Sequence, residues 1–316
     1  MSLIDRTRNL VQTVRTSAQH AVEKTENAVS NAAHVVGNTV SKATQAVDSF
    51  ENKVATKATA LNAQLFGTGS DKAFDGAIVG AGGQTYPPGT PLTQVAPVLP
   101  RNNPNPSETV VYVNGISNTK SDQLNSMQNI ADTTGAKVIG IHNATEGMVT
   151  DIAQCVQDKL DKGNNPAVDS LADTVYSELK AGHDVHLMAH SQGALITSRA
   201  LNHVEQRMRV EDGMSQAQVE QAMSKLKVET FGGAAAHYPD GPQYVHYVND
   251  KDLVPTLFGQ GNGKGLDDLL RDGGKGAVIR RFEAGSGISG AHSLNDMYLP
   301  HRIPFDQARA QGNVNP

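Results

Sequence analysis

The chain's most chemically informative pattern lies at residues 184–207, which read DVHLMAHSQGALITSRALNHVEQR. An apolar strand pattern runs into the short turn AHSQG and then into an amphipathic helix pattern. A serine hydroxyl is a poor nucleophile at neutral pH, so proteins that use one expose it on a tight turn beside a base and oxyanion donors. The small residues Ala189 and Gly193 flank Ser191, although the usual G-x-S-x-G pattern has glycine where Ala189 stands. The turn therefore predicts a nucleophilic Ser191.

Two later segments contain the histidine and carboxylate that such a serine needs. The strand pattern QYVHYV is followed by NDKDLVP, with Asp250 and Asp252, and AVIRRFE is followed by a loop that reaches AHSLNDMYL, with His292. His301 follows in YLPHRIPF. Histidine suits the role of base because its ordinary pKa of about 6.5 lets it take the serine proton and return it. A buried carboxylate would fix its tautomer, and periodicity alone does not separate Asp250 from Asp252.

Other histidines and a glycine-rich run have weaker chemical interpretations. His190 directly precedes the candidate nucleophile, and a histidine at this position commonly lines the active-site pocket without taking part in catalysis. His183 and His186 suggest zinc together with His190, but positions 183 and 186 point to opposite faces of a strand. Residues 259–276 contain seven glycines but lack the phosphate-loop spacing. That run predicts either a lid between the acid and the histidine or a plain flexible loop.

The elements that would position these residues alternate along the chain from Thr109 onward. This alternation predicts an α/β fold with a mostly parallel sheet covered by helices. Strand patterns lie at 109–113, 137–142, 184–189, 227–232, 243–248 and 277–283, and helix patterns at about 121–133, 148–160, 168–181, 192–208 and 215–225. Ser191, Asp252 and His292 each come just after a strand pattern, at the edge of the sheet where catalytic groups of such folds emerge.

Residues 1–66 are predicted to form a helical arm. They contain no proline, and apolar residues recur at alternating spacings of four and three from Val29 to Val54, which is a heptad pattern. Seven Lys or Arg stand against five Asp or Glu, a local net charge of +2. That excess is too small to establish membrane binding. Packing in a helical hairpin, a membrane surface, and a chaperone or secretion partner all stay open as roles for the arm.

Residues 67–107 separate the arm from the alternating region. They contain seven glycines and seven prolines in 41 positions, a composition typical of a linker or an irregular segment. The predicted organisation is thus a helical arm at 1–66, this segment at 67–107 and a catalytic domain at 108–316.

Residues 109–301 resemble the lipase and esterase branch of the α/β-hydrolases. NDKDLVP is similar to the N-x-x-D-x-V-P segment around the acid of class 3-like lipases, and AHSLNDMYL to their histidine segment. VVYVNGISN and VIGIHNATEG are similar to hydrolases among bacterial secreted effectors. The resemblance implies the triad Ser191, Asp252 and His292 and favours Asp252 over Asp250 and His292 over His301. It also implies an oxyanion hole made by the backbone N–H groups of Ile116, or else Gly115, and of Gln192.

Composition and charge limit the partners and the cellular compartment that the sequence allows. A net charge of -5, without clustered Lys and Arg, argues against nucleic acid as the principal partner. No run approaches the ~20 apolar residues of a membrane span, and the N-terminus lacks the apolar core of a signal peptide. We therefore expect a cytoplasmic protein, with leaderless export as an effector left open. The single cysteine, Cys155, excludes an intrachain disulfide and is expected to be a core thiol.

The sequence thus predicts a serine hydrolase that cleaves carboxylic esters, with a lipid or phospholipid as the preferred substrate. Such a reaction requires no metal and no organic cofactor. The alternative is an interaction or delivery protein, in which the arm binds a membrane or protein partner and the hydrolase scaffold is degenerate.

Overall fold

The computed structural model describes residues 72–116, 118–144, 165–261, 271–285 and 288–315. Within these residues one eight-stranded sheet has the order β2-β1-β4-β3-β5-β6-β7-β8. The six strands β3 to β8 pair with one another in parallel, and β1 pairs antiparallel with both β4 and β2. The strands are β1 (Ile78–Val79), β2 (Thr85–Tyr86), β3 (Thr109–Val113), β4 (Lys137–Ile141), β5 (Val185–His190), β6 (Leu226–Phe231), β7 (Gln243–Asn249) and β8 (Val278–Phe282).

Helices connect these strands and cover the sheet. The α-helices are α2 (Lys120–Thr134), α4 (Pro166–Lys180), α5 (Gln192–Val210), α6 (Gln216–Met223), α7 (Leu253–Phe258), α8 (Ile288–Ala291) and α9 (Phe305–Gln311). Shorter turns of helix are η1 (Lys72–Phe74), η2 (Ala81–Gly83), η3 (Leu92–Gln94), η5 (Leu294–Tyr298) and η6 (Leu299–His301). The predicted α/β fold with a mostly parallel, helix-covered sheet is confirmed. The helix predicted at 148–160 and Cys155 lie outside the described residues.

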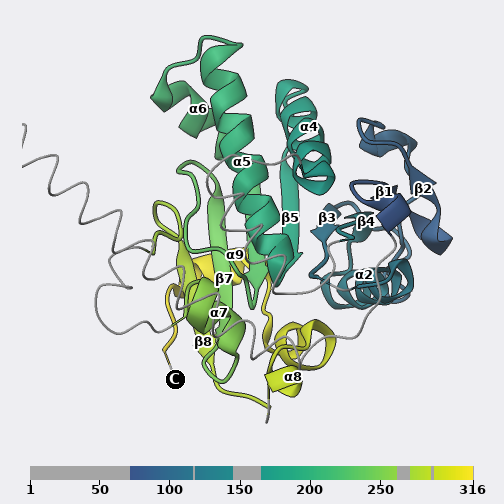
Figure 1. Cartoon of the computed structure of the whole chain (residues 1–316), viewed down its shortest axis with the longest axis vertical. Helices are drawn as coiled ribbons and strands as arrows, with labels where there is room; N and C mark the ends of the chain where they lie inside the picture. Colours follow the sequence, from purple (N-terminus) through teal and green to yellow (C-terminus); the bar gives the residue numbers. More distant parts are fainter. Residues whose placement is uncertain (1–71, 117, 145–164, 262–270, 286–287, 316) are drawn as a thin grey trace, which may run out of the picture. The chain divides into compact units, whose positions relative to one another are not determined.

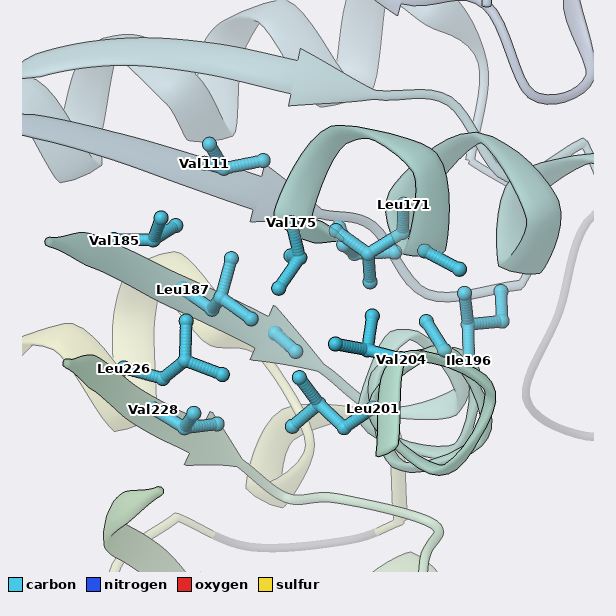
Figure 2. Packing of buried hydrophobic residues seen from close by; sticks show 14 of the residues in the cluster. Val111, Leu171, Val175, Val185, Leu187, Ile196, Leu201, Val204, Leu226 and Val228 are labelled. Atoms are coloured by element: carbon cyan, nitrogen blue, oxygen red, sulfur yellow. The ribbon is translucent and has the colours of Figure 1, made fainter. Parts of the chain in front are cut away.

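Alternate residues of each strand point to opposite faces, and both faces are buried. In β3, Val111 and Val113 belong to one hydrophobic cluster, whereas Val110 and Tyr112 belong to another. The first cluster joins the sheet to α4, α5 and α6, and α4 and α5 lie side by side (Figure 1). Figure 2 shows its side chains, with Leu187 of β5 facing apolar residues of α4 and α5. The second cluster joins the sheet to α2, η5 and α9.

Local signals in the sequence explain where the helices begin and end. Thr119 and Asp122 form a capping box at the start of α2, and Gly135 ends that helix in the left-handed conformation with φ of 69°. Asn165 caps α4, whose first residue is Pro166, a residue that tolerates this position because its missing N–H would be unpaired there. These caps define both ends of α2 and the start of α4.

The glycine- and proline-rich segment contributes to the sheet in a way that the sequence did not predict. Ile78 and Val79 of β1 pair with Ile141 and Gly140 of β4. Val98 forms a further bridge to β4. Residues 72–107 therefore extend the sheet beyond β4, while the predicted arm at 1–66 lies outside the described residues. The predicted division of the chain at residues 66 and 107 stays a prediction.

An ionic network, buried at His186 and Glu229 and exposed at Glu108, crosses the strands on the α9 side. Nδ1 of His186 lies 2.8 Å from Glu108, and Nε2 lies 2.8 Å from Glu229, which is fully buried and also accepts hydrogen bonds from Arg302. Burial disfavours the charged form of His186, but its two carboxylate partners outweigh burial and raise its pKa. His183 instead pairs with Glu178. His183 and His186 thus each bind carboxylates separately.

Candidate active site

Ser191 occupies a strained turn between β5 and α5. Its φ of 57° and ψ of -125° make it the one non-glycine residue with positive φ in the described part of the chain. Backbone hydrogen bonds hold this conformation, because the Ser191 N–H donates to the carbonyl of Phe231 and its own carbonyl accepts from Ala194 and Ala234. Strain of this kind costs about 1–3 kcal/mol and occurs at functional sites. The strained conformation therefore makes Ser191 a candidate functional residue.

Small residues let three segments converge on this turn. A Cβ atom on Gly193 would lie 2.3 Å from the Val113 carbonyl oxygen, so the start of α5 touches the end of β3. A Cβ atom on Gly115 would lie 2.9 Å from the Ser191 Cβ. Ala189 is fully buried and paired between β3 and β6. Positions 193 and 115 therefore require glycine, because the neighbouring segments lie too close to admit a Cβ atom.

Three side chains form a continuous hydrogen-bonded chain. Nε2 of His292 lies 2.8 Å from the Ser191 Oγ, and Nδ1 of His292 lies 2.6 Å from the Asp252 Oδ2. All three residues are buried, with exposed fractions of 3% for Ser191, 6% for His292 and 1% for Asp252. The structure therefore brings together the three residues selected from the sequence, although they lie 40 to 101 positions apart.

Asp252 is fixed on both of its oxygens. It is the N-cap of α7, where Oδ1 accepts a hydrogen bond from the Val254 N–H at 2.9 Å. Oδ2 accepts from His292 and, at 2.6 Å, from the hydroxyl of Tyr298. With the second oxygen held in this way, the carboxylate presents a defined lone pair to the imidazole.

Asn249 links the acid segment to the histidine segment. Its side-chain amide donates to the carbonyls of Ala284 and Ala291, both at 2.9 Å, and its side-chain oxygen accepts from the Ala284 N–H. Ala291 immediately precedes His292. The first residue of the N-x-x-D-x-V-P segment thus has a structural role, because it holds the backbone that carries His292 beside the loop that carries Asp252.

The rival acid and the rival base point elsewhere. Asp250 forms an ion pair with Arg281 of β8 at 2.8 Å. His301 lies on Phe282, with ring centroids 4.1 Å apart, and its Nδ1 donates to the Met297 carbonyl. The structure brings neither residue into the hydrogen-bonded chain of Ser191.

His190 packs directly against His292. The two ring centroids lie 4.7 Å apart, and the His190 Nε2 donates to the His292 carbonyl at 2.9 Å. Burial and the neighbouring His292 lower the pKa of His190 to about 3. His190 therefore stays neutral near pH 7 and can hold the histidine segment without placing a second positive charge beside an imidazolium.

The two predicted oxyanion donors lie next to an amide network that the sequence analysis did not identify. The Asn143 side-chain N–H donates to the Gln192 Oε1 at 2.8 Å, and Asn114 donates to the carbonyls of Asn143 at 2.8 Å and Gly115 at 2.9 Å. The Gly115 carbonyl and the Ile116 N–H belong to one trans peptide and point in opposite directions. Fixing that carbonyl therefore fixes the direction of the Ile116 N–H.

This arrangement has the parts that covalent catalysis by a serine requires. A hydroxyl lies within hydrogen-bond distance of an imidazole, and a buried carboxylate orients the imidazole's other nitrogen. Sequence reasoning missed Tyr298 and Asn143, which are distant in sequence from the groups they contact. Tyr298 could have been suspected from the sequence, because it lies in the histidine segment AHSLNDMYL and a buried phenol needs a hydrogen-bond partner.

Comparison with known proteins adds no family assignment. No protein-family model matches the sequence, and no curated protein matches it.

Within the part of the chain that the structure describes, no helix is both long enough and apolar enough to cross a bilayer. Residues 262–270, the centre of the run predicted to form either a lid or a plain flexible loop, lie outside the described residues, so both alternatives stay predictions.

Proposed function

We propose that the protein is a serine hydrolase that cleaves carboxylic esters and belongs to the lipase and esterase branch of the α/β-hydrolases. The observation that carries this proposal is the hydrogen-bonded chain from Ser191 through His292 to Asp252, with separations of 2.8 and 2.6 Å. The strained conformation of Ser191 and the mostly parallel sheet behind it give further support.

The proposed mechanism assigns one role to each member of the chain. The His292 Nε2 takes the proton from the Ser191 Oγ as that oxygen attacks the ester carbonyl, and then gives the proton to the departing alcohol. Asp252 keeps the Nδ1–H tautomer and stabilises the imidazolium. The N–H groups of Ile116 and Gln192 stabilise the oxyanion, and each such donor is worth about 3 kcal/mol in the transition state. Water, activated by His292, then hydrolyses the acyl-enzyme.

The proposed substrate class is a lipid ester, including phospholipids. Its support is the similarity of the acid and histidine segments to those of class 3-like lipases. A membrane, chaperone or secretion partner for residues 1–66 is a separate proposal that this chemistry does not test.

Ester hydrolysis by the full chain tests the proposal. Purified wild-type protein, Ser191→Ala and the control Ser198→Ala would be given p-nitrophenyl esters of increasing acyl length and phosphatidylcholine vesicles. Ser198 is another buried serine, inside α5, but its hydroxyl donates to a backbone carbonyl. We expect Ser191→Ala to lose at least about 10³-fold in rate and Ser198→Ala to keep activity. Equal rates in wild type and Ser191→Ala would contradict the proposal, and inactivity of all three would favour the interaction protein.

A further inference from the structure

Tyr298 shares the carboxylate oxygen that faces the imidazole. Its hydroxyl donates to the Asp252 Oδ2 at 2.6 Å, the same length as the hydrogen bond between that oxygen and the His292 Nδ1. Tyr298 has no exposed surface. Its oxygen also accepts from the Asn249 N–H at 3.4 Å, so it lies between the backbone end of β7 and the acid.

Aromatic rings and a glycine confine the Tyr298 phenol. Phe231, Phe282 and His190 each meet its ring edge to face, with centroids 6.4, 5.4 and 6.2 Å away. A Cβ atom on Gly232 would lie 2.8 Å from both the phenol oxygen and the Asp252 Oδ2. The space around the shared oxygen is therefore filled, and the hydroxyl has one position.

We propose that Tyr298 is a positioning residue that holds Asp252 in line with His292 and takes part of the carboxylate's negative charge. This inference rests on the proposed function, because it assigns Tyr298 a part in activating Ser191. Burial, together with the adjacent charge of Asp252, raises the pKa of Tyr298 well above 10. The phenol therefore remains a donor throughout the pH range in which a serine hydrolase works.

Charge sharing has a consequence for the pH dependence of the reaction. A carboxylate that also accepts from a phenol stabilises an imidazolium less than a carboxylate whose charge faces only the imidazole. Removing the phenol oxygen should therefore favour the protonated ring and move the acid limb of the rate profile to higher pH.

Few other ionisable groups of the described residues face this cluster. His190 contacts it from β5, and Asp250 follows β7 but is paired with Arg281. Tyr298→Phe keeps the aromatic ring that His190 meets and leaves the Asp250–Arg281 pair in place, so a shift of the acid limb would report on the phenol hydroxyl.

The test measures the rate of inactivation by a fluorophosphonate between pH 5 and 9 in the full chain. Tyr298→Phe removes the hydroxyl, and site-specific replacement by 3-fluorotyrosine makes it a stronger donor of nearly the same size. Tyr247→Phe is the matched control, because Tyr247 is also buried against Phe231 but donates to the Ile303 carbonyl. Ser191→Ala shows whether labelling requires the proposed nucleophile.

We expect Tyr298→Phe to lower the plateau rate about tenfold and to move the acid limb up by roughly half to one pH unit. The fluorotyrosine protein should move the acid limb in the opposite direction, a result that a merely structural role would not produce. It also keeps the test valid if Tyr298→Phe fails to fold. Unshifted profiles in protein that labels at Ser191 would overturn the role of Tyr298. Labelling that persists in Ser191→Ala would instead overturn the proposed function.

Discussion

Adding one methyl group at Gly193 should damage both the fold and the reactivity of Ser191. The new Cβ would lie 2.3 Å from the Val113 carbonyl oxygen and 2.8 Å from that of Asn114. Ordinary contact begins near 3.4 Å, so the start of α5 would have to move by about 1 Å. Both neighbours are backbone atoms, which cannot rotate away as a flexible side chain could.

The expected cost has two parts. Overpacking of a well-packed site typically costs 1–3 kcal/mol, and the closeness of the Val113 contact places Gly193→Ala near the upper end, about 3 kcal/mol. Displacing the nucleophile by about 1 Å relative to its base should also slow acylation about 100-fold. Because Ser191 directly precedes Gln192 and Gly193, the turn cannot avoid the movement.

Urea unfolding and fluorophosphonate labelling measure the two parts on the same preparation. Gly290→Ala is the control, since Gly290 lies in α8 and a Cβ atom there would meet no atom of the described residues within 4 Å. The control should match wild type or gain up to about 1 kcal/mol. Gly193→Ala should have a lower urea midpoint with an unchanged slope. A Gly193→Ala protein as stable and as reactive as wild type would refute the close-approach argument.

Three further predictions follow from the contacts of the site and the core. Asp252→Asn should lower kcat for a p-nitrophenyl ester about 10³- to 10⁴-fold, because it removes the carboxylate that orients His292. Asp250→Asn removes only the ion pair with Arg281 of β8, so its kcat should stay within about threefold of wild type. A larger loss of kcat in Asp250→Asn than in Asp252→Asn would show that the acid is misassigned. Asn114→Ala, which frees the Gly115 carbonyl from one of its amide donors, should lower kcat about 10- to 100-fold, and an unchanged kcat would show that this network does not order the oxyanion donors. Burial opposes charge on His186, but its two carboxylate partners raise its pKa above the ordinary 6.5. The contribution of the charged His186 to stability is therefore complete below about pH 6.5 and is lost as the pH rises through the raised pKa. The difference in urea midpoint between wild type and His186→Gln should shrink from pH 6 to 9, and a growing difference would contradict the charged state assigned to His186.

The sheet and the candidate site differ in how far the sequence could predict them. The strand at 109–113 was predicted to the residue, because a run of β-branched and aromatic residues between turn signals has few other solutions. The strands of two residues, Ile78–Val79 and Thr85–Tyr86, are too short to show a period, and they lie where glycine and proline indicate irregular structure. They form because β4 offers an unpaired edge, a tertiary cause that local sequence does not express.

Within the site, chain order carried most of the information. The order of the three segments indicated Ser191, the loop with Asp250 and Asp252, and the region with His292 and His301, and the resemblance to class 3-like lipases favoured Asp252 and His292. The structure places the side chains of Ser191, Asp252 and His292 in hydrogen-bond contact. Contacts such as Asn143 to Gln192 depend on how a loop after one strand meets a helix after another. No periodicity records that geometry, so Asn143 could be found only once the strands had been placed.

Peptide mapping of the fluorophosphonate adduct shows directly which residue is the nucleophile. Wild-type protein would be labelled to completion, digested and analysed by mass spectrometry to locate the modified residue. We predict one adduct, on Ser191, that forms at least about 10³-fold more slowly in His292→Ala. An adduct on another residue, or labelling of Ser191 at an unchanged rate in His292→Ala, would contradict it.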